Sequence, residues 1–202
     1  MRAAGVFQPV MGHEFTGTIA AVGNGAGLRE GDPVVVHPGG SCGACYYCTN
    51  GLSNVCATQW GTGYMHPGAY AEYCLVRAEQ ALPLPDASLM ERAALTEPFG
   101  VALRAVNRGG VQPGEGVFIA GGGPIGLLSV IAAARRNAGT IIVSEPAESR
   151  RKLALKLGAT HAVNARKEKV AQAGLAILGP GRADVGVDNS GGVDGGAHCR
   201  EL

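Results

Sequence analysis

The sequence is poor in charged and in aromatic residues. Only 16% of its 202 residues are charged, 5% are aromatic, and the formal net charge is +1. Basic residues form no run, so the charge pattern gives no support for binding to nucleic acid or to an anionic membrane surface. At the same time, the hydrophobic fraction of 46% is far above that of a disordered chain. We therefore expect a folded, globular protein.

Signals for export or membrane insertion are also lacking. The opening stretch, MRAAGVFQPVMGHEF, has one arginine but no continuous apolar segment, so we expect no secretory signal peptide. Residues 116–134 are uncharged and long enough to span a bilayer. However, three consecutive glycines and a proline near their middle would leave backbone groups unsatisfied in lipid. A strand, a turn and a buried helix explain this stretch better, and we expect a cytoplasmic protein without a membrane span.

Glycine, by contrast, is abundant, and the 33 glycines separate short apolar runs. This distribution predicts many tight turns and close backbone approaches. In the first hundred residues, β-rich runs alternate with turn signals, which predicts strands in residues 15–23, 33–40 and 69–76. Residues 88–106 instead have apolar residues at helical spacing.

The predicted helix in residues 88–106 carries its own start signal. Ser88 is a plausible N-cap, and Glu91 stands three positions later, as in a capping box. Pro98 lies inside the same stretch, where proline removes a backbone donor. We expect the helix to kink or restart there.

From residue 114 onward, strand and helix signals alternate. Strands are expected in residues 117–120, 140–145, 161–164 and 183–192, and helices in residues 125–139, 148–159 and 167–179. The second helix should end at Gly158, a typical helix-terminating residue. This alternation predicts an α/β fold with a doubly wound parallel sheet. We place a domain boundary near residue 105, which gives domains of residues 1–105 and 106–202.

A glycine-rich loop lies between the first of these strands and its helix. Gly121, Gly123 and Gly126 form a G-x-G-x-x-G pattern, with Pro124 and Ile125 between the last two glycines. The first glycine allows a tight turn, the second lets a pyrophosphate approach the backbone, and the third lets helix and strand pack closely. The free N–H groups of the helix start favour phosphate. These five residues are therefore predicted to bind a dinucleotide, although a turn of this kind can also bind nothing.

An acidic residue follows at the position that a dinucleotide site requires. Glu145 ends the next predicted strand, 19 residues after Gly126. A carboxylate there accepts hydrogen bonds from an adenosine ribose diol and repels a 2′-phosphate, which favours NAD over NADP. Arg150, a further candidate cofactor-binding residue, and Arg151 lie nearby and could soften this exclusion.

The cysteine loop, residues 42–56, contains four closely spaced thiols. Cys42, Cys45, Cys48 and Cys56 follow the pattern C-x2-C-x2-C-x7-C. Four thiolates complete a tetrahedral zinc shell and leave no open position for a substrate, so this zinc should be structural. Two alternatives remain: disulfides, which need an oxidising compartment, and an iron–sulfur cluster, in which proline usually follows the fourth cysteine. Here Ala57 follows Cys56.

Four ordered motifs reveal a resemblance. They are GHEFTG at residues 12–17, the cysteine loop, TEPFGVAL at residues 96–103, and the glycine loop at residues 121–126. In this order they resemble the zinc-dependent medium-chain alcohol and polyol dehydrogenases, such as the sorbitol, threonine and butanediol dehydrogenases. The resemblance covers the chain up to about Gly191. It implies a partial GroES-like, β-rich catalytic domain followed by a partial NAD-binding Rossmann domain.

The resemblance also implies site residues and a reaction. His13 would be a ligand of a catalytic zinc, Glu97 a further ligand, and Glu14 an adjacent group or alternate ligand. The cysteine loop would match the family's structural-zinc lobe. The implied reaction is NAD-linked oxidation of a secondary alcohol or polyol to a ketone, with zinc acting as a Lewis acid. The partners implied are a small alcohol or polyol and, for the full-length family, further copies of the same chain.

The sequence departs from the family pattern at both ends. Only twelve residues precede His13 and none is a cysteine, whereas the family's first catalytic zinc ligand is an upstream cysteine. The serine or threonine that begins the family's proton relay is missing with it. After the fourth predicted strand, the tail of residues 191–202 has no recognisable helix. We therefore expect a fragment with little or no activity, or alternatively a zinc-stabilised nucleotide-binding module without catalysis.

Overall fold

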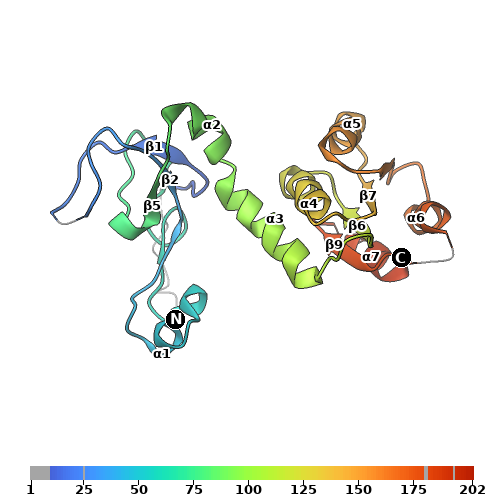
Figure 1. Ribbon diagram of the computed structural model, residues 1–202, viewed down its shortest axis with the longest axis horizontal. Helices are drawn as coiled ribbons and strands as arrows, with labels where there is room; N and C mark the ends of the chain where they lie inside the picture. Colours follow the sequence, from blue (N-terminus) through green and yellow to red (C-terminus); the bar gives the residue numbers. More distant parts are fainter. Residues whose placement is uncertain (1–9, 25, 180–181, 193) are drawn as a thin grey trace. The chain divides into compact units, whose positions relative to one another are not determined.

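The protein is described by a computed structural model that covers residues 10–24, 26–179, 182–192 and 194–202. The chain forms two compact units, Met1–Glu97 and Pro98–Leu202. In Figure 1 the first unit runs from blue to green, and the second from yellow-green to red. The boundary falls before residue 105 because most of α3 packs onto the second unit's core: Val106 is fully buried there, and Phe99 and Leu103 pack against the same cluster.

The first unit is built on a three-stranded antiparallel sheet in the order β1-β2-β5. These strands are β1 (Thr16–Thr18), β2 (Pro33–Val36) and β5 (Ala81–Pro83). Val34 and Val36 are buried together with Ala81 and form the centre of a small hydrophobic core. The valine run predicted to be a strand therefore lies at the middle of the sheet.

Two strand predictions in the first unit need correction. The strand predicted for residues 15–23 is limited to β1, and the one predicted for residues 69–76 does not form. A strand needs a partner to bond its backbone groups. In residues 69–76 the N–H groups of Ala69 and Tyr70 donate instead to the carbonyls of Gly12 and Met11. Polar and apolar residues do alternate in this sequence, but among the described residues no neighbouring strand pairs with the segment.

A separate lobe of the first unit carries the cysteine loop. Its elements are β3 (Gly39–Gly40), α1 (Tyr46–Thr49), η1 (Ser53–Val55) and β4 (Trp60–Gly61), followed further along the chain by η2 (Ala78–Gln80). Strands β3 and β4 pair antiparallel. The buried Gln80 side chain donates to the carbonyls of His37 and Pro38, both at 2.9 Å. This amide therefore joins the residue just before β5 to the residues that lead from β2 into the lobe.

The helical stretch after the sheet differs from the prediction in its start. It consists of η3 (Ala87–Leu89), α2 (Met90–Ala93) and α3 (Thr96–Gly109). The capping residue is Asp86 rather than Ser88, because the Asp86 carboxylate accepts the Ser88 N–H at 2.7 Å. The helix does restart, but at Thr96, which places Pro98 in the first turn. A missing N–H costs nothing at that position.

The second unit is a four-stranded parallel sheet with helices on both faces. Its strands are β6 (Gly116–Ala120), β7 (Thr140–Ser144), β8 (His161–Val163) and β9 (Val185–Asp188). Its helices after α3 are α4 (Pro124–Arg135), α5 (Glu148–Leu157), α6 (Val170–Leu178) and α7 (Gly195–Glu201). The strand order β8-β7-β6-β9 confirms the predicted doubly wound sheet.

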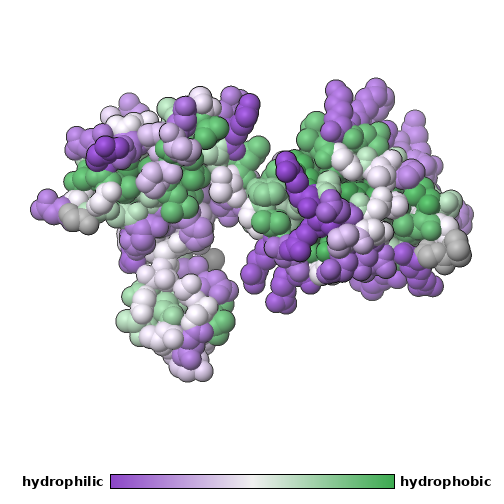
Figure 2. Space-filling view, viewed as in Figure 1, coloured by the Kyte–Doolittle hydropathy of each residue, from purple (hydrophilic) through white to green (hydrophobic). Residues whose placement is uncertain are grey.

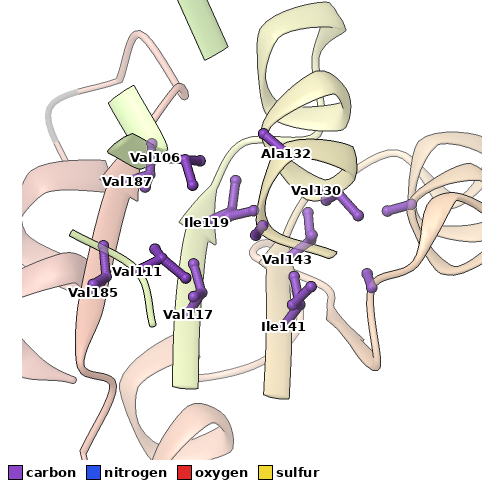
Figure 3. Packing of buried hydrophobic residues seen from close by; sticks show 13 residues of the cluster. Val106, Val111, Val117, Ile119, Val130, Ala132, Ile141, Val143, Val185 and Val187 are labelled. Atoms are coloured by element: carbon purple, nitrogen blue, oxygen red, sulfur yellow. The ribbon is translucent and has the colours of Figure 1, made fainter. Parts of the chain in front are cut away.

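Two hydrophobic layers hold this sheet. On one face, Ile119 and Val143 meet Val106 of α3 and Val130 of α4, as Figure 3 shows. On the other face, Phe118, Ile142 and Val163 pack against residues of α6 and the chain's last residues. Because strands β6 and β7 are buried on both faces, their sequences are continuous apolar runs, as parallel strands usually are.

The tail of residues 191–202 also needs correction, because it contains α7. Leu202 is buried, and its carbonyl accepts the Ala183 N–H at 2.9 Å. Cys199 packs over the backbone of Gly186 in β9. The helix was not predicted because it is short and begins with two glycines, which are poor helix formers. Packing against the sheet supplies the stability that its sequence lacks.

The surface of the second unit is polar over α5. In Figure 2, hydrophilic side chains gather over this helix, where Glu148, Arg150 and Lys152 are exposed. Gly158 ends α5 with a φ of 119°, as predicted.

Among the described residues, no helix is both long enough and apolar enough to cross a membrane.

Candidate functional site

The first candidate site brings together three residues from distant parts of the first unit. His13 and Glu14 precede β1, and Glu97 lies in the first turn of α3. One potential ligand atom from each of the three lies within 4.8 Å of the other two. His13 and Glu97 are half-buried, and Glu14 is exposed. We call this cluster the His13 site.

Contacts between β1 and the helical stretch bring Glu97 to this position. The Thr16 hydroxyl in β1 donates to the Met90 carbonyl in α2 at 3.2 Å. Helix α2 also packs against β1 and β2. Since only two residues separate α2 from α3, these contacts fix where the first turn of α3 lies relative to His13.

The donor set of the His13 site suits a zinc ion. An imidazole nitrogen and two carboxylate oxygens are typical ligands of catalytic zinc, which commonly has three protein ligands and one open position. Within the described residues this cluster contains no cysteine. The arrangement can therefore hold a metal ion and leave room for a substrate oxygen.

Tyr64 is a neighbour of this site that the sequence did not indicate. Its ring meets the His13 ring edge to face, with centroids 5.7 Å apart and an interplanar angle of 87°. Partial burial, together with the negative charge of Glu97, raises the pKa of the Tyr64 phenol. The hydroxyl therefore keeps its proton near neutral pH and can donate a hydrogen bond. A lone tyrosine in a glycine-rich stretch gave no signal of this role.

The second candidate site is the cysteine loop. The Sγ–Sγ distances are 3.5 Å for Cys45–Cys48 and for Cys42–Cys56, and 3.9 Å for Cys42–Cys48 and for Cys45–Cys56. A tetrahedron with zinc–sulfur bonds of about 2.3 Å has sulfur atoms about 3.8 Å apart. A cluster of several iron atoms would need the sulfurs farther apart. All six cysteines are free thiols, and the four of the loop fit a single tetrahedral ion.

The thiols of the loop differ in acidity. The backbone N–H groups of Ala44 and Cys45 lower the pKa of Cys42 to about 5. Loss of solvation and the neighbouring thiols raise the pKa of Cys48 to about 11. One thiol is thus already a thiolate near neutral pH, while another holds a proton that a metal ion would displace.

The third candidate site is a cavity of about 330 Å³ at the carboxyl ends of β6, β7 and β9. Gly121 has a φ of 94°, and a Cβ there would lie 2.8 Å from the Asn189 carbonyl oxygen. A Cβ on Gly126 would collide with the Gly121 carbonyl oxygen. Gly123, by contrast, faces open space. Gly121 and Gly126 are therefore tightly packed against backbone atoms, whereas Gly123 faces the open cavity. A pyrophosphate would approach from that open side.

Glu145 is fixed at the wall of this cavity. Its side chain is 5% exposed and lies 3.9 Å from the Arg150 guanidinium. One carboxylate oxygen accepts the Gly122 N–H and the other the Ala147 N–H, both at 2.8 Å. These two bonds hold the carboxylate in one orientation and leave further lone pairs on both oxygens for a ligand.

The cavity includes only some of the residues that the sequence indicated. Gly121, Gly123, Glu145 and Arg150 line it, whereas Pro124, Ile125 and Gly126 form the first turn of α4 behind it. Polar lining residues that were missed are Asn189, Ser190, Asp194 and His198. Asn189 and Ser190 directly follow β9. Their position at the end of a parallel strand beside the glycine loop was a signal that could have identified them.

Comparison with known protein families matches both units. Residues 2–86 match the family model described as the alcohol dehydrogenase GroES-like domain, and residues 124–195 match the one described as zinc-binding dehydrogenase. Sorbitol dehydrogenase of Bacillus subtilis is 38% identical over 184 residues, which are 90% of this chain and 52% of that protein. L-threonine 3-dehydrogenase of Pyrococcus furiosus is 38% identical over 183 residues, with the same coverage of 90% and 52%.

Solved structures give the same result. A protein described as a zinc-binding dehydrogenase from Sinorhizobium meliloti 1021, bound to NADP, has a TM-score of 0.90 at 34% identity, over 97% of this chain and 58% of that chain. L-idonate 5-dehydrogenase from Escherichia coli has a TM-score of 0.80 at 29% identity, over 96% and 56%. The chain spans about half the length of the curated relatives it matches.

Proposed function

Because the chain belongs to the zinc-dependent medium-chain dehydrogenase family, we propose that it serves NAD-linked oxidation of a secondary alcohol or polyol to a ketone. The observation that carries this proposal is the convergence of His13, Glu14 and Glu97, whose ligand atoms lie within 4.8 Å of one another. In this proposal the first unit performs catalysis and the second unit binds the dinucleotide.

In this proposal the chain holds zinc at two places. His13 and Glu97 hold the catalytic ion, with Glu14 beside it as a further or alternate ligand. A bound zinc supplies a Lewis acid that favours the alkoxide form of a substrate hydroxyl. Cys42, Cys45, Cys48 and Cys56 hold the structural ion, since their four sulfurs form one compact cluster. The Tyr64 ring contacts His13, and its hydroxyl is proposed to donate a hydrogen bond to a substrate oxygen.

The second unit is proposed to bind NAD in preference to NADP. The glycine loop receives the pyrophosphate at the start of α4, and the fixed Glu145 carboxylate accepts hydrogen bonds from the adenosine ribose. A 2′-phosphate on that ribose would meet the negative charge of Glu145. Arg150, 3.9 Å from this carboxylate, partly offsets the repulsion.

We further propose that the 202-residue chain has little or no activity by itself, since its relatives are about twice as long. The whole protein is proposed to be cytoplasmic and to form homo-oligomers, as expected from the family.

Titration of the zinc-loaded chain with NAD⁺ and with NADP⁺ tests the cofactor proposal by calorimetry. We expect NAD⁺ to bind at least about 10-fold more tightly, which corresponds to about 1.4 kcal/mol. Equal affinities, or tighter binding of NADP⁺, would contradict the role of Glu145.

Turnover is tested with sorbitol, 2,3-butanediol, L-threonine and 2-propanol by absorbance of NADH. We expect no turnover above background. Rapid turnover that is lost in Glu97→Gln would show that the chain is a complete catalyst. NAD⁺ binding without any metal at the His13 site would support instead a nucleotide-binding module that performs no catalysis.

A further inference from the structure

A loop of residues 61–70, which we call the platform loop, lies directly against the segment that leads into His13. Three successive backbone hydrogen bonds join the two. The Gly68, Tyr70 and Ala69 N–H groups donate to the carbonyls of residues 10, 11 and 12, at 3.0, 2.9 and 3.0 Å respectively. Since His13 follows immediately, the platform loop fixes the backbone from which the imidazole projects.

Glycine makes this close approach possible. A Cβ on either Gly63 or Gly68 would overlap the Gly12 carbonyl oxygen, and one on Gly63 would also lie 3.1 Å from the His13 Cβ. Gly12 itself has a φ of 100°, and its Cβ would lie 2.7 Å from the Tyr70 ring. No side chain could be added to Gly63 or Gly68 without moving the backbone before His13, and one on Gly12 would crowd the Tyr70 ring.

The platform loop also touches the His13 side chain. The Tyr64 ring lies over Gly61, where a Cβ would collide with it, and presents an edge-to-face contact to the imidazole. The loop therefore contacts both the backbone before His13 and the imidazole ring itself. Neither the glycines nor Tyr64 carries a ligand atom of the metal cluster.

We propose that Gly63 and Gly68 are positioning residues that set the direction in which His13 meets the metal ion. This inference rests on the proposed function, because it needs a metal at the His13 site. Ligand orientation controls metal affinity, and the loss of a group that orients a ligand typically costs roughly 10- to 100-fold in binding. The platform loop would thus determine how tightly the His13 site holds its metal, without being part of it.

Co²⁺ titration of the full, metal-free chain tests this inference. Thiolate ligands give Co²⁺ strong charge-transfer absorption, which nitrogen and oxygen ligands do not, so the two sites report separately in one sample. Gly68→Ala is the test variant, since φ at Gly68 is not in the left-handed region and the only obstacle is space. Gly23→Ala is its matched control, because a Cβ there meets nothing within 4 Å.

We expect Gly68→Ala to weaken Co²⁺ binding at the His13 site roughly 10- to 100-fold and to shift its visible bands, while the cysteine-loop absorption stays unchanged. Gly23→Ala should match the wild type at both sites. Wild-type affinity and bands in Gly68→Ala would overturn the positioning role alone. A wild-type chain that shows only the thiolate signal would contradict the metal site itself, and with it both proposals.

A second pair guards against a variant that fails to fold. Gly63 has a φ of 85° and Gly31 a φ of 88°, but a Cβ on Gly31 meets nothing within 4 Å. Alanine at the two positions therefore imposes similar backbone strain, and only Gly63→Ala also crowds Gly12 and His13. Weaker Co²⁺ binding in Gly63→Ala than in Gly31→Ala supports the inference, and equal binding in the two variants opposes it.

Discussion

At the scale of single residues, the cysteine loop depends on where each thiol sits. Cys56 is buried, with 7% of its surface exposed, and its sulfur accepts the Cys42 N–H at 3.3 Å. Cys74 lies outside the loop, and its thiol donates a hydrogen bond to the Pro67 carbonyl at 3.7 Å. We therefore expect replacement by serine to have different effects on zinc binding at these two cysteines.

Replacing Cys56 with serine should remove the tightly held zinc. We expect zinc affinity to fall by more than about 100-fold. Removing a group that only orients a metal ligand already lowers metal affinity roughly 10- to 100-fold, and Cys56 is itself a proposed ligand. Zinc retained after dialysis against a weak chelator measures the effect. Cys74→Ser is the matched control and should keep its zinc; a Cys56→Ser chain that also keeps it would show that the loop is not a four-thiolate site.

The acidity of the thiols predicts how zinc binding depends on pH. With the pKa of Cys42 lowered to about 5 and that of Cys48 raised to about 11, the metal-free loop near neutral pH holds a thiolate at Cys42 and a proton on Cys48. Zinc must displace that proton. Affinity should therefore rise with pH up to about 11 and fall more steeply below about 5, where Cys42 also becomes protonated.

Calorimetry of zinc binding in buffers of different ionisation enthalpy measures the protons released. Near neutral pH we expect at least one proton per zinc ion. A binding enthalpy that does not vary with the buffer would mean that Cys48 was already deprotonated.

Glu145 makes a further prediction at this scale. In Glu145→Gln the amide nitrogen cannot accept a hydrogen bond, so the N–H of either Gly122 or Ala147 loses its acceptor, and the negative charge beside the ribose is gone. Hydrogen bonds to charged groups contribute about 1.5–3 kcal/mol. We expect NAD⁺ affinity to fall at least about 10-fold and NADP⁺ affinity to change less. Titration with both cofactors measures this, and an unchanged NAD⁺ to NADP⁺ ratio would refute it.

At the scale of elements, the glycines of the second unit differ sharply in what surrounds them. Gly126 in α4 is buried, and a Cβ there would collide with the Gly121 carbonyl oxygen. Gly100 in α3 is exposed, and a Cβ there would meet nothing within 4 Å. Both glycines lie in helices. Replacing each with alanine therefore distinguishes the effect of steric crowding from the effect of helix propensity.

Gly126→Ala should push α4 away from the end of β6 and abolish dinucleotide binding, with a lower melting temperature. Gly100→Ala should instead raise stability by about 0.5–1 kcal/mol, because alanine favours a helix over glycine. Chemical denaturation and NAD⁺ titration of both variants check the pair. NAD⁺ binding that survives in Gly126→Ala would mean that the glycine loop does not form the cofactor site.

Elements with strong local signals could be predicted from the sequence. The apolar runs of β6 and β7, the glycine loop and the Gly158 terminus of α5 each have a local physical cause, and each lies where expected. The segment of residues 69–76 does not, because alternating residues indicate a strand only when another strand is there to pair with it. Helix α7 was missed for the opposite reason, since its stability comes from packing on β9.

The candidate sites also differ in how far the sequence could predict them. The ligands of the cysteine loop are close in sequence, so their spacing alone indicated a metal. His13 and Glu97 are far apart, and only the resemblance to a family suggested that they meet. Tyr64 and the platform loop had no signal, because their contacts with His13 depend on tertiary structure rather than on any local pattern.

At the scale of the whole molecule, each unit has its own proposed ligand. The first unit contains two clusters of potential metal ligands, the cysteine loop and the His13 site. The second unit contains the cavity at the glycine loop. The chain spans about half the length of its relatives, so the number of metal ions it holds decides how much of the proposed catalytic apparatus it retains.

Native mass spectrometry of the chain after zinc addition, before and after mild chelation, tests the central claim most directly. We predict two zinc ions per folded chain, because both ligand clusters are present in the first unit. Mild chelation should remove one ion, and His13→Ala or Glu97→Gln should prevent its binding, while the other stays with the cysteine loop. A single zinc ion that is indifferent to His13 and Glu97 would contradict the claim that the His13 site holds a metal.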